Sequence, residues 1–525
     1  MQIDDLFHSP ADTIARLAAM QVHLYREDAG LQNYFHALDE GLFYGAPAQA
    51  HGRSSIPPAL ARPLRWADSL SRFTPPAKIK ADVLFCPTPY FGRNTENRFL
   101  TRTLLGLAET GAEVLCLLPA YAPVRQNLEA RLTEAGYRRQ VTFLDPAASF
   151  NAIEGRTRAL AARQRGRAAC EAITQILEPH GLAPTTLDLA RFEEAAHHLE
   201  AWERWAPFLE FDAVVARCHW YEFCSPACHT GLARGKPVIT FQQGVVGHSL
   251  DLPIVASHFV SFGEPSAVVL AEANRRFFAA AGRPEPPVAY VPAGALFDTI
   301  TPLPQQFSQQ TVLLIDLHSV AGNTWGDEGQ VQALVQLAEK LLAAGLPLRR
   351  LVIRPHPQWS GFDLSACFRL VREHRDVCEL SHPAWSLEDD LRRSSVVVGI
   401  WSGALTIASA CGLPTLFLDV EDGLKTRDLA CFSPEQTLAP EAALVELARL
   451  LTDPQHYAEA SRIALANAGQ YYAGGAEATL DGAFFAPLLR KPDPQNRRPA
   501  PKAPRAATPS GAAPGASAPH AQGKE

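Results

Sequence analysis

The second half of this chain alternates short apolar segments with helix-forming segments, and this rhythm constrains the fold more than any other feature. From about residue 311, apolar runs such as QTVLLIDLH, LRRLVIRPHP, SVVVGI and PTLFLD are separated by amphipathic segments such as GDEGQVQALVQLAEKLLAAG. Short apolar strands that alternate with helices are typical of a parallel sheet covered on both faces. We therefore expect a doubly wound α/β domain over residues 301–485.

The first half shows the same rhythm from residue 76 onward. ADVLFCPTPYFGRN, NRFLTRTLLGLAETG and AEVLCLLP indicate a strand, a helix and a strand, which form a βαβ unit. FDAVVAR, KPVITFQQG and HFVSFGEPS indicate further strands, and a long helical insertion is expected from about Glu154 to Trp205. Residues 76–300 are thus predicted to form a second Rossmann-like domain, which faces the 301–485 domain across a cleft.

The two ends of the chain depart from this pattern. Residues 1–75 contain amphipathic segments such as DTIARLAAMQVHLY and a Pro-rich linker, SSIPPALARP, and predict a helical N-terminal extension. Residues 486–525 are rich in Pro and Ala, a composition that cannot bury a core, so we expect a disordered tail. From Lys491 onward this tail carries six basic and two acidic residues.

Composition excludes several classes of protein. Hydrophobic residues make up 47% of the chain and charged residues 20%, as in folded proteins with large cores. No apolar run approaches the roughly 20 residues of a membrane helix, and MQIDDLFHSP lacks a signal-peptide pattern, so a cytoplasmic protein is expected. The formal net charge of -7, despite the basic tail, argues against nucleic acid as a partner. The tail itself suggests peripheral contact with the inner face of a membrane, a solvated extension without a partner being the alternative.

The ten cysteines have no repeated spacing, and reduced thiols are expected in a chain of this kind. One group, Cys218, His219, Cys224, Cys228 and His229, contains enough ligands for zinc. Its C-x5-C-x3-C spacing is not a usual structural zinc spacing, however. We interpret the cysteines of this group as buried free thiols beside a strand. We expect no metal and no cofactor.

Ligands of open parallel sheets bind beyond the carboxyl ends of the strands, so the loops after strands hold the candidate residues. Arg354, Pro355, His356 and Pro357 directly follow the strand LRRLVI. The prolines stiffen this loop, Arg354 can grip a phosphate with two N–H groups, and His356 can donate a hydrogen bond or a proton to it. We predict a phosphate site here; a surface turn with incidental polar residues is the alternative.

Two further loops of this half are candidates for phosphate contact. GIWSGALT places Ser402 at a helix N-cap and Gly403, Ala404 and Leu405 in the first turn, where N–H groups bind anions. An ordinary capped helix explains Ser402 equally well. HSVAGNTWGDEG follows the first strand, and Gly322 would let the backbone approach a phosphate.

The first half offers residues for the acceptor side of a reaction. Gln243 and Gly244 end one predicted strand and are followed by His248, while Glu222 follows FDAVVARC. Either Glu222 or His248 could deprotonate an acceptor hydroxyl, with Gln243 and Gly244 beside the acceptor. Each of these residues alone could instead be structural or simply exposed.

Several common catalytic motifs are absent from the sequence. It contains no P-loop, no GxGxxG after a first strand and no GxSxG nucleophile elbow. ATP-dependent kinases, simple dehydrogenases and serine hydrolases are therefore disfavoured.

At the residues discussed above, the second half resembles the nucleotide-binding domain of GT-B glycosyltransferases. SSVVVGIWSGALTIASACGLPTLFL resembles the S-G-(A/G)-x-T…G-x-P stretch that these enzymes share with UDP-GlcNAc 2-epimerases. The RPHP loop is similar to the His-Pro motif of bacterial sialyltransferases and to a motif of CDP-glycerol glycerophosphotransferases. QQGVVG, with FVSFGEPS after it, resembles a stretch of surface-polysaccharide transferases. Many GT-B enzymes carry a ribose-binding Glu in the helix after the S-G element, where this chain has Ala408 and Ser409.

The resemblance implies metal-independent sugar transfer. His356 would contact the donor phosphate and protonate it as it leaves, Arg354 would add positive charge, and Ser402 with the first-turn amides would hold the phosphate. The partners would be a nucleotide-sugar donor, with CMP- and CDP-linked sugars as the candidates, and a capsular or other surface polysaccharide or a lipid-linked glycan as acceptor. The alternatives are a non-hydrolysing sugar-nucleotide epimerase and a non-catalytic assembly protein of polysaccharide biosynthesis that keeps the GT-B shape.

Overall fold

The computed structural model describes two α/β halves and the segments that join them. The described residues are 13–35, 37–38, 78–87, 94–118, 123–145, 152–183, 187, 189–220, 224–242, 252–297, 300–304, 306–315, 328–355, 365–382, 384–400, 402–419, 436–473 and 478–490. The predicted linker SSIPPALARP lies outside these residues, and so does the part of the predicted tail (486–525) from residue 491 onward.

The described residues of the first half form a seven-stranded parallel sheet with the order β4-β3-β2-β6-β7-β8-β9. Its strands are β2 (Val83–Cys86), β3 (Val114–Leu117), β4 (Val141–Leu144), β6 (Ala213–Ala216), β7 (Val238–Phe241), β8 (His258–Ser261) and β9 (Ala289–Pro292). The chain first builds outward through β3 and β4, and then returns to add β6 on the other side of β2. This reversal is the switch point of a doubly wound sheet.

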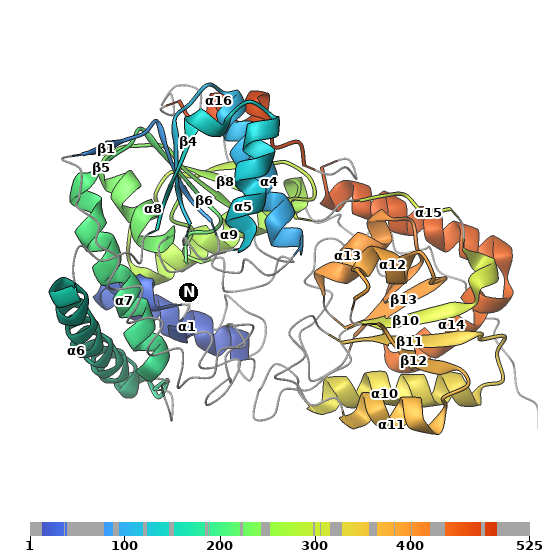
Figure 1. Cartoon of the computed structure of the whole chain (residues 1–525). Coiled ribbons are helices and arrows are strands. Elements are labelled where there is room, and N and C mark those ends of the chain that lie inside the picture. Colours follow the sequence, from blue (N-terminus) through green and yellow to red (C-terminus); the bar gives the residue numbers. More distant parts are fainter. Residues whose placement is uncertain are drawn as a thin grey trace, which may run out of the picture.

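Helices cover both faces of this sheet (Figure 1). They are α4 (Asn94–Glu109), α5 (Pro123–Glu134), α8 (Cys224–Ala233) and α9 (Glu264–Ala281). Alternate residues of β2 serve the two faces, because successive side chains of a strand point in opposite directions. Val83 and Phe85 belong to the apolar cluster that contains residues of α4 and α5, whereas Leu84 and Cys86 belong to the cluster that contains residues of α8 and α9.

Two long helices, α6 (Ala152–Leu177) and α7 (Leu189–Trp205), are inserted after β4 and pack against each other. Gly166 permits this close crossing, because a Cβ atom there would lie 2.7 Å from the backbone nitrogen of Glu193. The predicted helical insertion is therefore present. After it, β5 (Leu209–Glu210) pairs with β1 (Ile79–Lys80) in a small parallel sheet that the sequence did not lead us to expect.

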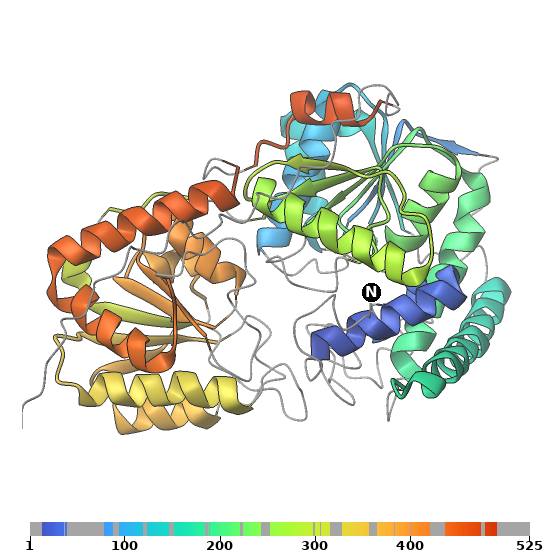
Figure 2. The same ribbon diagram turned by 180° about the vertical axis from the view of Figure 1, so that it is seen from behind.

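The described part of the predicted N-terminal extension is helical and belongs to the core of the first half. Helix α1 (Thr13–Glu27) lies against α6 and α9, and both views show it running beside α9 (Figures 1 and 2). Met20, Val22 and Leu24 are fully buried in this contact. Short 3-10 helices complete the described elements: η2 (Ala29–Tyr34), η3 (Arg138–Gln140), η4 (Glu178–His180), η5 (Ala206–Phe208) and η7 (Phe307–Gln309).

The described residues of the second half form a six-stranded parallel sheet with the order β12-β11-β10-β13-β14-β15. Its strands are β10 (Thr311–Ile315), β11 (Arg350–Arg354), β12 (Cys378–Leu380), β13 (Val396–Gly399), β14 (Thr415–Leu418) and β15 (Thr437–Leu438). The strand order again reverses beside its first strand, between β10 and β13. The predicted doubly wound α/β class is thus confirmed for both halves.

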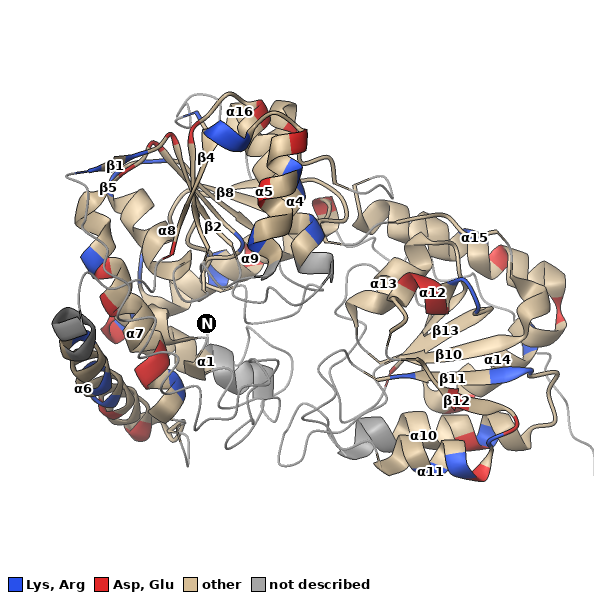
Figure 3. Ribbon diagram, in the orientation of Figure 1, with Lys and Arg blue, Asp and Glu red and all other residues tan. Residues whose placement is uncertain are grey.

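The helices of the second half also lie on both faces of its sheet. They are α10 (Glu328–Ala343), α11 (Ser365–Glu373), α12 (Leu387–Leu391), α13 (Gly403–Ala410), α14 (Pro440–Thr452) and α15 (Pro454–Tyr471). Val312 and Leu314 pack with residues of α10 and α14, whereas Leu313 and Ile315 pack with residues of α13 and α15. Among the described residues, Lys, Arg, Asp and Glu lie mostly on the helices, and the central strands of both sheets carry few of them (Figure 3).

The end of the described chain joins the two halves. Helix α15 runs along the second half towards the first, and α16 (Gly482–Leu488) then packs against α4 (Figure 1). One apolar cluster therefore contains residues of both sheets, including Phe85 and Leu313. The prediction of a disordered tail from residue 486 onward was wrong at its start, because residues 486–488 belong to helix α16 and Leu488 is buried. This helix was not expected from the sequence, because its seven residues show too little periodicity.

No helix among the described residues is both long enough and apolar enough to cross a membrane.

Candidate functional site

The switch point of the second sheet brings three strand ends together. Ile315 at the end of β10 pairs with Arg354 at the end of β11, and on the other side Leu314 pairs with Val398 of β13. A Cβ atom on Gly399, the last residue of β13, would lie 3.3 Å from the carbonyl oxygen of Ile315. Ligands of doubly wound sheets bind beyond such strand ends, so this edge is the candidate site.

Helix α13 begins at this edge and is capped as the sequence predicted. Ser402 has extended backbone angles (φ -160°, ψ 142°), and its hydroxyl oxygen accepts a hydrogen bond of 3.2 Å from the amide of Ala404. The amide of Leu405 donates to the carbonyl oxygen of Ser402 at 3.1 Å. Two of the three predicted phosphate-binding amides, those of Ala404 and Leu405, therefore already have acceptors.

The third amide, that of Gly403, is the one most open to a ligand. Among the described residues it has no hydrogen-bond partner. A Cβ atom built on Gly403 would meet no atom of the described residues within 4 Å. A helix start with an N–H group that has no partner among the described residues is suited to bind an anion.

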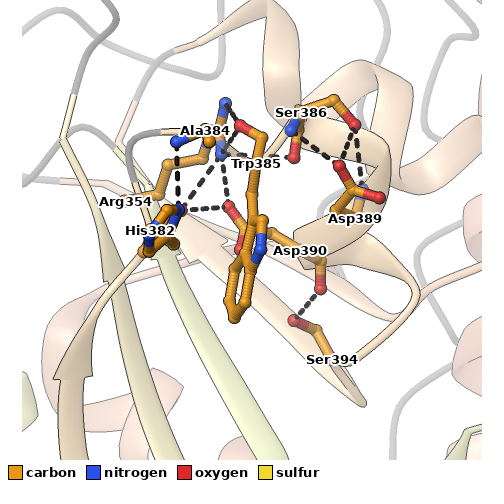
Figure 4. Close-up of polar contacts among 9 residues, drawn as sticks. Arg354, His382, Ala384, Trp385, Ser386, Asp389, Asp390 and Ser394 are labelled. Atoms are coloured by element: carbon orange, nitrogen blue, oxygen red, sulfur yellow. Dashed lines mark hydrogen bonds and ion pairs between the residues drawn. The ribbon is translucent and has the colours of Figure 1, made fainter.

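Arg354, by contrast, is held by the protein itself (Figure 4). Its guanidinium forms an ion pair with Asp390 of α12, whose side chain is 1% exposed, and Nη1 also donates to the hydroxyl of Ser381 at 3.2 Å. The same Nη1 lies 3.4 Å from the carbonyl oxygen of Trp385 and 3.3 Å from that of Ser386. These contacts make Arg354 an anchor for the end of β11, and the prediction that it binds a phosphate stays a prediction.

The start of α12 is ordered by a capping box that holds Asp390 in place. Ser386 accepts a hydrogen bond from the amide of Asp389 at 3.2 Å, and the carboxylate of Asp389 accepts one from the amide of Ser386 at 2.8 Å. Hydrogen bonds from the hydroxyl and the amide of Ser386 lower the pKa of Asp389. The stretch S-L-E-D at residues 386–389 carries the sequence pattern of such a box, with Ser at the N-cap and an acidic residue three positions later.

Trp385 lies next to Arg354 and forms an aromatic and cationic platform that sequence reasoning also missed. The guanidinium of Arg393 lies 3.8 Å from the centroid of the indole ring, and the ring of His382 lies 5.6 Å from it. Arg393 and His382 are exposed, and Trp385 is half-buried. A flat aromatic ring of this kind can stack on a nucleobase. In the sequence, only the position of Trp385 in the loop after the apolar segment DVCELS indicated a possible binding residue.

All of the other predicted site residues lie outside the described residues. These are His356, Pro357, Gly322, Glu222, Gln243, Gly244 and His248. The predicted cleft between the halves also stays a prediction. The described strands that precede Glu222 and Gln243 in the chain are β6 and β7. These two strands are adjacent and parallel, and β6 pairs with β2 at the switch point of the first sheet.

The cysteine group of the first half consists of buried free thiols, as expected. Cys218, Cys224 and Cys228 are unpaired and fully enclosed, and burial raises the pKa of each thiol. For His229 burial has the opposite effect and lowers the pKa to about 4, because the charged form of histidine is the protonated one. In the described part of the chain, no three His, Cys, Asp or Glu side chains are arranged to hold a metal ion.

No known protein family matches this chain, and no curated protein does. Similar solved structures include HepE of Anabaena in complex with UDP and glucose, with 11% identity, 78% of this chain and 99% of that chain covered, and a TM-score of 0.41. A second is α,α-trehalose 6-phosphate synthase of Burkholderia multivorans, with 14% identity, 78% of this chain and 96% of that chain covered, and a TM-score of 0.43. A third is UDP-GlcNAc 2-epimerase of Neisseria meningitidis bound to UDP-GlcNAc, with 13% identity, 78% of this chain and 99% of that chain covered, and a TM-score of 0.41. At these scores the assignment of the fold rests on the strand order of the two sheets.

Proposed function

We propose that this chain is a glycosyltransferase of GT-B architecture, which moves a sugar from a nucleotide-activated donor to a glycan or lipid-linked glycan acceptor. The observation that carries the proposal is the start of α13. There Ser402 caps the helix, and the amide of Gly403 has no hydrogen-bond partner among the described residues. The donor phosphate would accept a hydrogen bond from this amide and gain from the partial positive charge of the helix start.

The nucleotide base would lie on the platform of Trp385 and Arg393. This platform is joined to the same sheet edge, because the carbonyl oxygen of Trp385 accepts from Arg354 at the end of β11. A base stacked on the indole and a phosphate at Gly403 would place the nucleotide across the ends of β10, β11 and β13. CMP, CDP and UDP derivatives all fit this description, and a capsular or other surface polysaccharide is the acceptor we favour.

The proposed reaction is displacement at the anomeric carbon of the donor sugar. An acceptor hydroxyl attacks this carbon, the bond from the carbon to the phosphate oxygen breaks, and the nucleotide leaves. Glu222 or His248, in loops after strands of the first half, would take the hydroxyl proton. His356 would donate a hydrogen bond or a proton to the departing phosphate. It follows Arg354 by two residues, so its loop starts from a strand end that an ion pair holds in place.

A pair of glycine variants tests the donor site. Gly403→Ala adds a methyl group where no atom of the described residues lies within 4 Å, so we expect it to leave the described fold intact and to obstruct a phosphate at the Gly403 amide. Gly469→Ala in α15 also meets no atom within 4 Å and serves as the matched control. We expect one of CMP, CDP, UDP or GDP to raise the melting temperature of the wild type and of Gly469→Ala, and to do so much less for Gly403→Ala. Equal shifts in all three proteins would contradict a phosphate at α13.

A second experiment tests the reaction. With the nucleotide-sugar that corresponds to the best nucleotide, the wild type should form a glycoside, and His356→Ala should retain nucleotide binding with activity reduced at least 100-fold. Full activity of His356→Ala would remove this residue from the mechanism. An epimer formed from UDP-GlcNAc without an acceptor would identify an epimerase instead, and no binding of any nucleotide would indicate an assembly protein without catalysis.

A further inference from the structure

Tyr472 occupies the junction between the two halves of the molecule. It is the C-cap of α15, and its side chain is buried. On one side its ring packs against Phe262, which follows β8 of the first half, at a centroid distance of 5.4 Å. On the other side its hydroxyl contacts the hydroxyl of Thr406 in α13. A single side chain thus touches the first half and the candidate donor helix.

The direction of the hydrogen bond between the two hydroxyls follows from their partners. Thr406 donates its only hydroxyl proton to the carbonyl oxygen of Gly403 at 2.7 Å. The oxygen of Thr406 must therefore accept from Tyr472, because a hydroxyl has one proton to give. Tyr472, Thr406 and the Gly403 carbonyl form a continuous chain of hydrogen bonds that ends on the first turn of α13, and such chains strengthen their members.

The end of α15 is also pressed against the first half through the backbone. A Cβ atom on Gly263, which precedes α9, would lie 2.2 Å from the carbonyl oxygen of Tyr471. The ring of Tyr471 packs on that of Phe262 as well, at 5.8 Å between centroids. This close packing fixes where α15 ends and therefore where the hydroxyl of Tyr472 lies.

We infer that Tyr472 is a positioning residue for the donor site. Through Thr406 it holds the carbonyl group of Gly403, the residue whose N–H group is proposed to donate a hydrogen bond to the phosphate. Because the ring of Tyr472 packs on Phe262, the position of this carbonyl also depends on how the first half packs against α15. This inference rests on the proposed function, because the site that Tyr472 positions is the proposed donor site.

A double-mutant cycle tests this role. Tyr472→Phe keeps the ring against Phe262 and removes the hydroxyl, and Thr406→Val removes the other end of the contact. Each should weaken binding of the nucleotide identified by thermal shift about three- to tenfold, the usual worth of one hydrogen bond. The double variant should bind the nucleotide no more weakly than whichever single variant has the lower affinity, because both substitutions break the same chain of hydrogen bonds. Wild-type affinity in Tyr472→Phe, or effects that multiply in the double variant, would overturn the inference.

A control and a second measurement separate this inference from the proposed function. Tyr457, also in α15, donates its hydroxyl proton to the carbonyl oxygen of Ser395 at 3.1 Å, far along the helix from Tyr472. Tyr457→Phe should lower the melting temperature and leave nucleotide affinity within twofold. Without any ligand, amide hydrogen exchange in the first turn of α13 should be faster in Tyr472→Phe than in the wild type and unchanged in Tyr457→Phe.

The outcomes of the two proposals can be told apart. If the wild type binds nucleotide and Gly403→Ala weakens binding while Tyr472→Phe does not, only the role of Tyr472 is wrong. If no nucleotide binds but exchange in α13 is faster in Tyr472→Phe, the brace exists and the donor site does not. If neither effect is seen, both proposals fail.

Discussion

Arg354 at the end of β11 and Asp390 in α12 form an ion pair across the edge of the second sheet, and the carboxylate is almost completely buried. Ser381, one residue beyond β12, donates its hydroxyl proton to the same carboxylate oxygen at 2.6 Å. A buried carboxylate is costly unless it is paired and hydrogen-bonded, so these three side chains hold one another in a fixed arrangement. They join β11, β12 and α12 next to the candidate donor site.

Removing the carboxylate should be strongly destabilising. Asp390→Ala leaves the guanidinium of Arg354, which is 17% exposed, without its counter-charge, and the free energy of unfolding should fall by about 3–5 kcal/mol. Urea denaturation followed by circular dichroism measures this change. Glu379→Ala breaks the exposed ion pair with Arg350 and should cost less than about 1 kcal/mol. A loss for Asp390→Ala no larger than that for Glu379→Ala would contradict the structural role of the buried pair.

The contact between Gly263 and α15 predicts a steric effect at the junction of the halves. In Gly263→Ala the new methyl group would overlap the carbonyl oxygen of Tyr471, so backbone must move, and we expect a loss of about 1–3 kcal/mol in the free energy of unfolding. Gly469→Ala should instead be neutral or stabilising by up to about 1 kcal/mol, because it adds a better helix former in open space. Thermal unfolding of both variants measures the difference, and equal melting temperatures would exclude the close approach.

The aromatic platform predicts a residue-specific effect on nucleotide affinity. Trp385→Ala should weaken nucleotide binding about tenfold, since stacking of a base on an aromatic ring contributes about 1–3 kcal/mol, and Trp385→Phe should retain most of the affinity. Phe368 in α11 is 54% exposed, and Phe368→Ala is the control for loss of an exposed aromatic side chain from the same half. Isothermal titration calorimetry measures these affinities. Unchanged affinity in Trp385→Ala would place the base elsewhere.

Two histidines of the first half, His229 and His258, predict loss of stability at acidic pH. Burial lowers the pKa of His229 to about 4, from an ordinary value of 6.5, and also lowers the pKa of His258. Between pH 6.5 and about 4, the unfolded chain binds a proton at His229 and the folded chain does not. The free energy of unfolding therefore falls as the pH falls from about 6.5 towards 4. The contribution of His229 amounts to at most about 3 kcal/mol.

Denaturation curves at several pH values check this dependence. His229→Gln should flatten the decline between pH 6.5 and 4, because glutamine has no proton to bind, whereas substitution of the exposed His382 by Gln should leave it unchanged. A decline of equal steepness in the wild type and in His229→Gln would show that other groups cause it.

The elements that depend on local sequence were predictable. The strand β13 and the helix α13 lie where SVVVGI and GALTIASACG indicated them, and Ser402 caps α13 as its residue type suggested. Capping and amphipathic periodicity depend on residues within about four positions of one another, so they can be read from a single sequence. The short strands β1 and β5 and the helix α16 were missed, because elements this short leave almost no periodic signal.

The candidate site was predictable only in part. The strand-end rule pointed to Arg354 and to the start of α13 correctly as parts of one edge. It did not indicate that Arg354 would be held by Asp390, 36 residues further along the chain. Nor did it indicate that two of the three first-turn amides would already be hydrogen-bonded, which leaves Gly403 as the open one.

The sequence by itself determined that this protein forms two doubly wound α/β halves, because the alternation of apolar strands and amphipathic helices allows little else to bury those strands on both faces. Only the tertiary structure decided which polar groups face a ligand and which face the protein. The pairs Arg354 with Asp390, Tyr472 with Thr406, and Gly263 with Tyr471 form between segments that meet only when the sheets are built and α15 crosses between them. Such contacts depend on the approach of distant segments in space, which no local pattern of residues encodes.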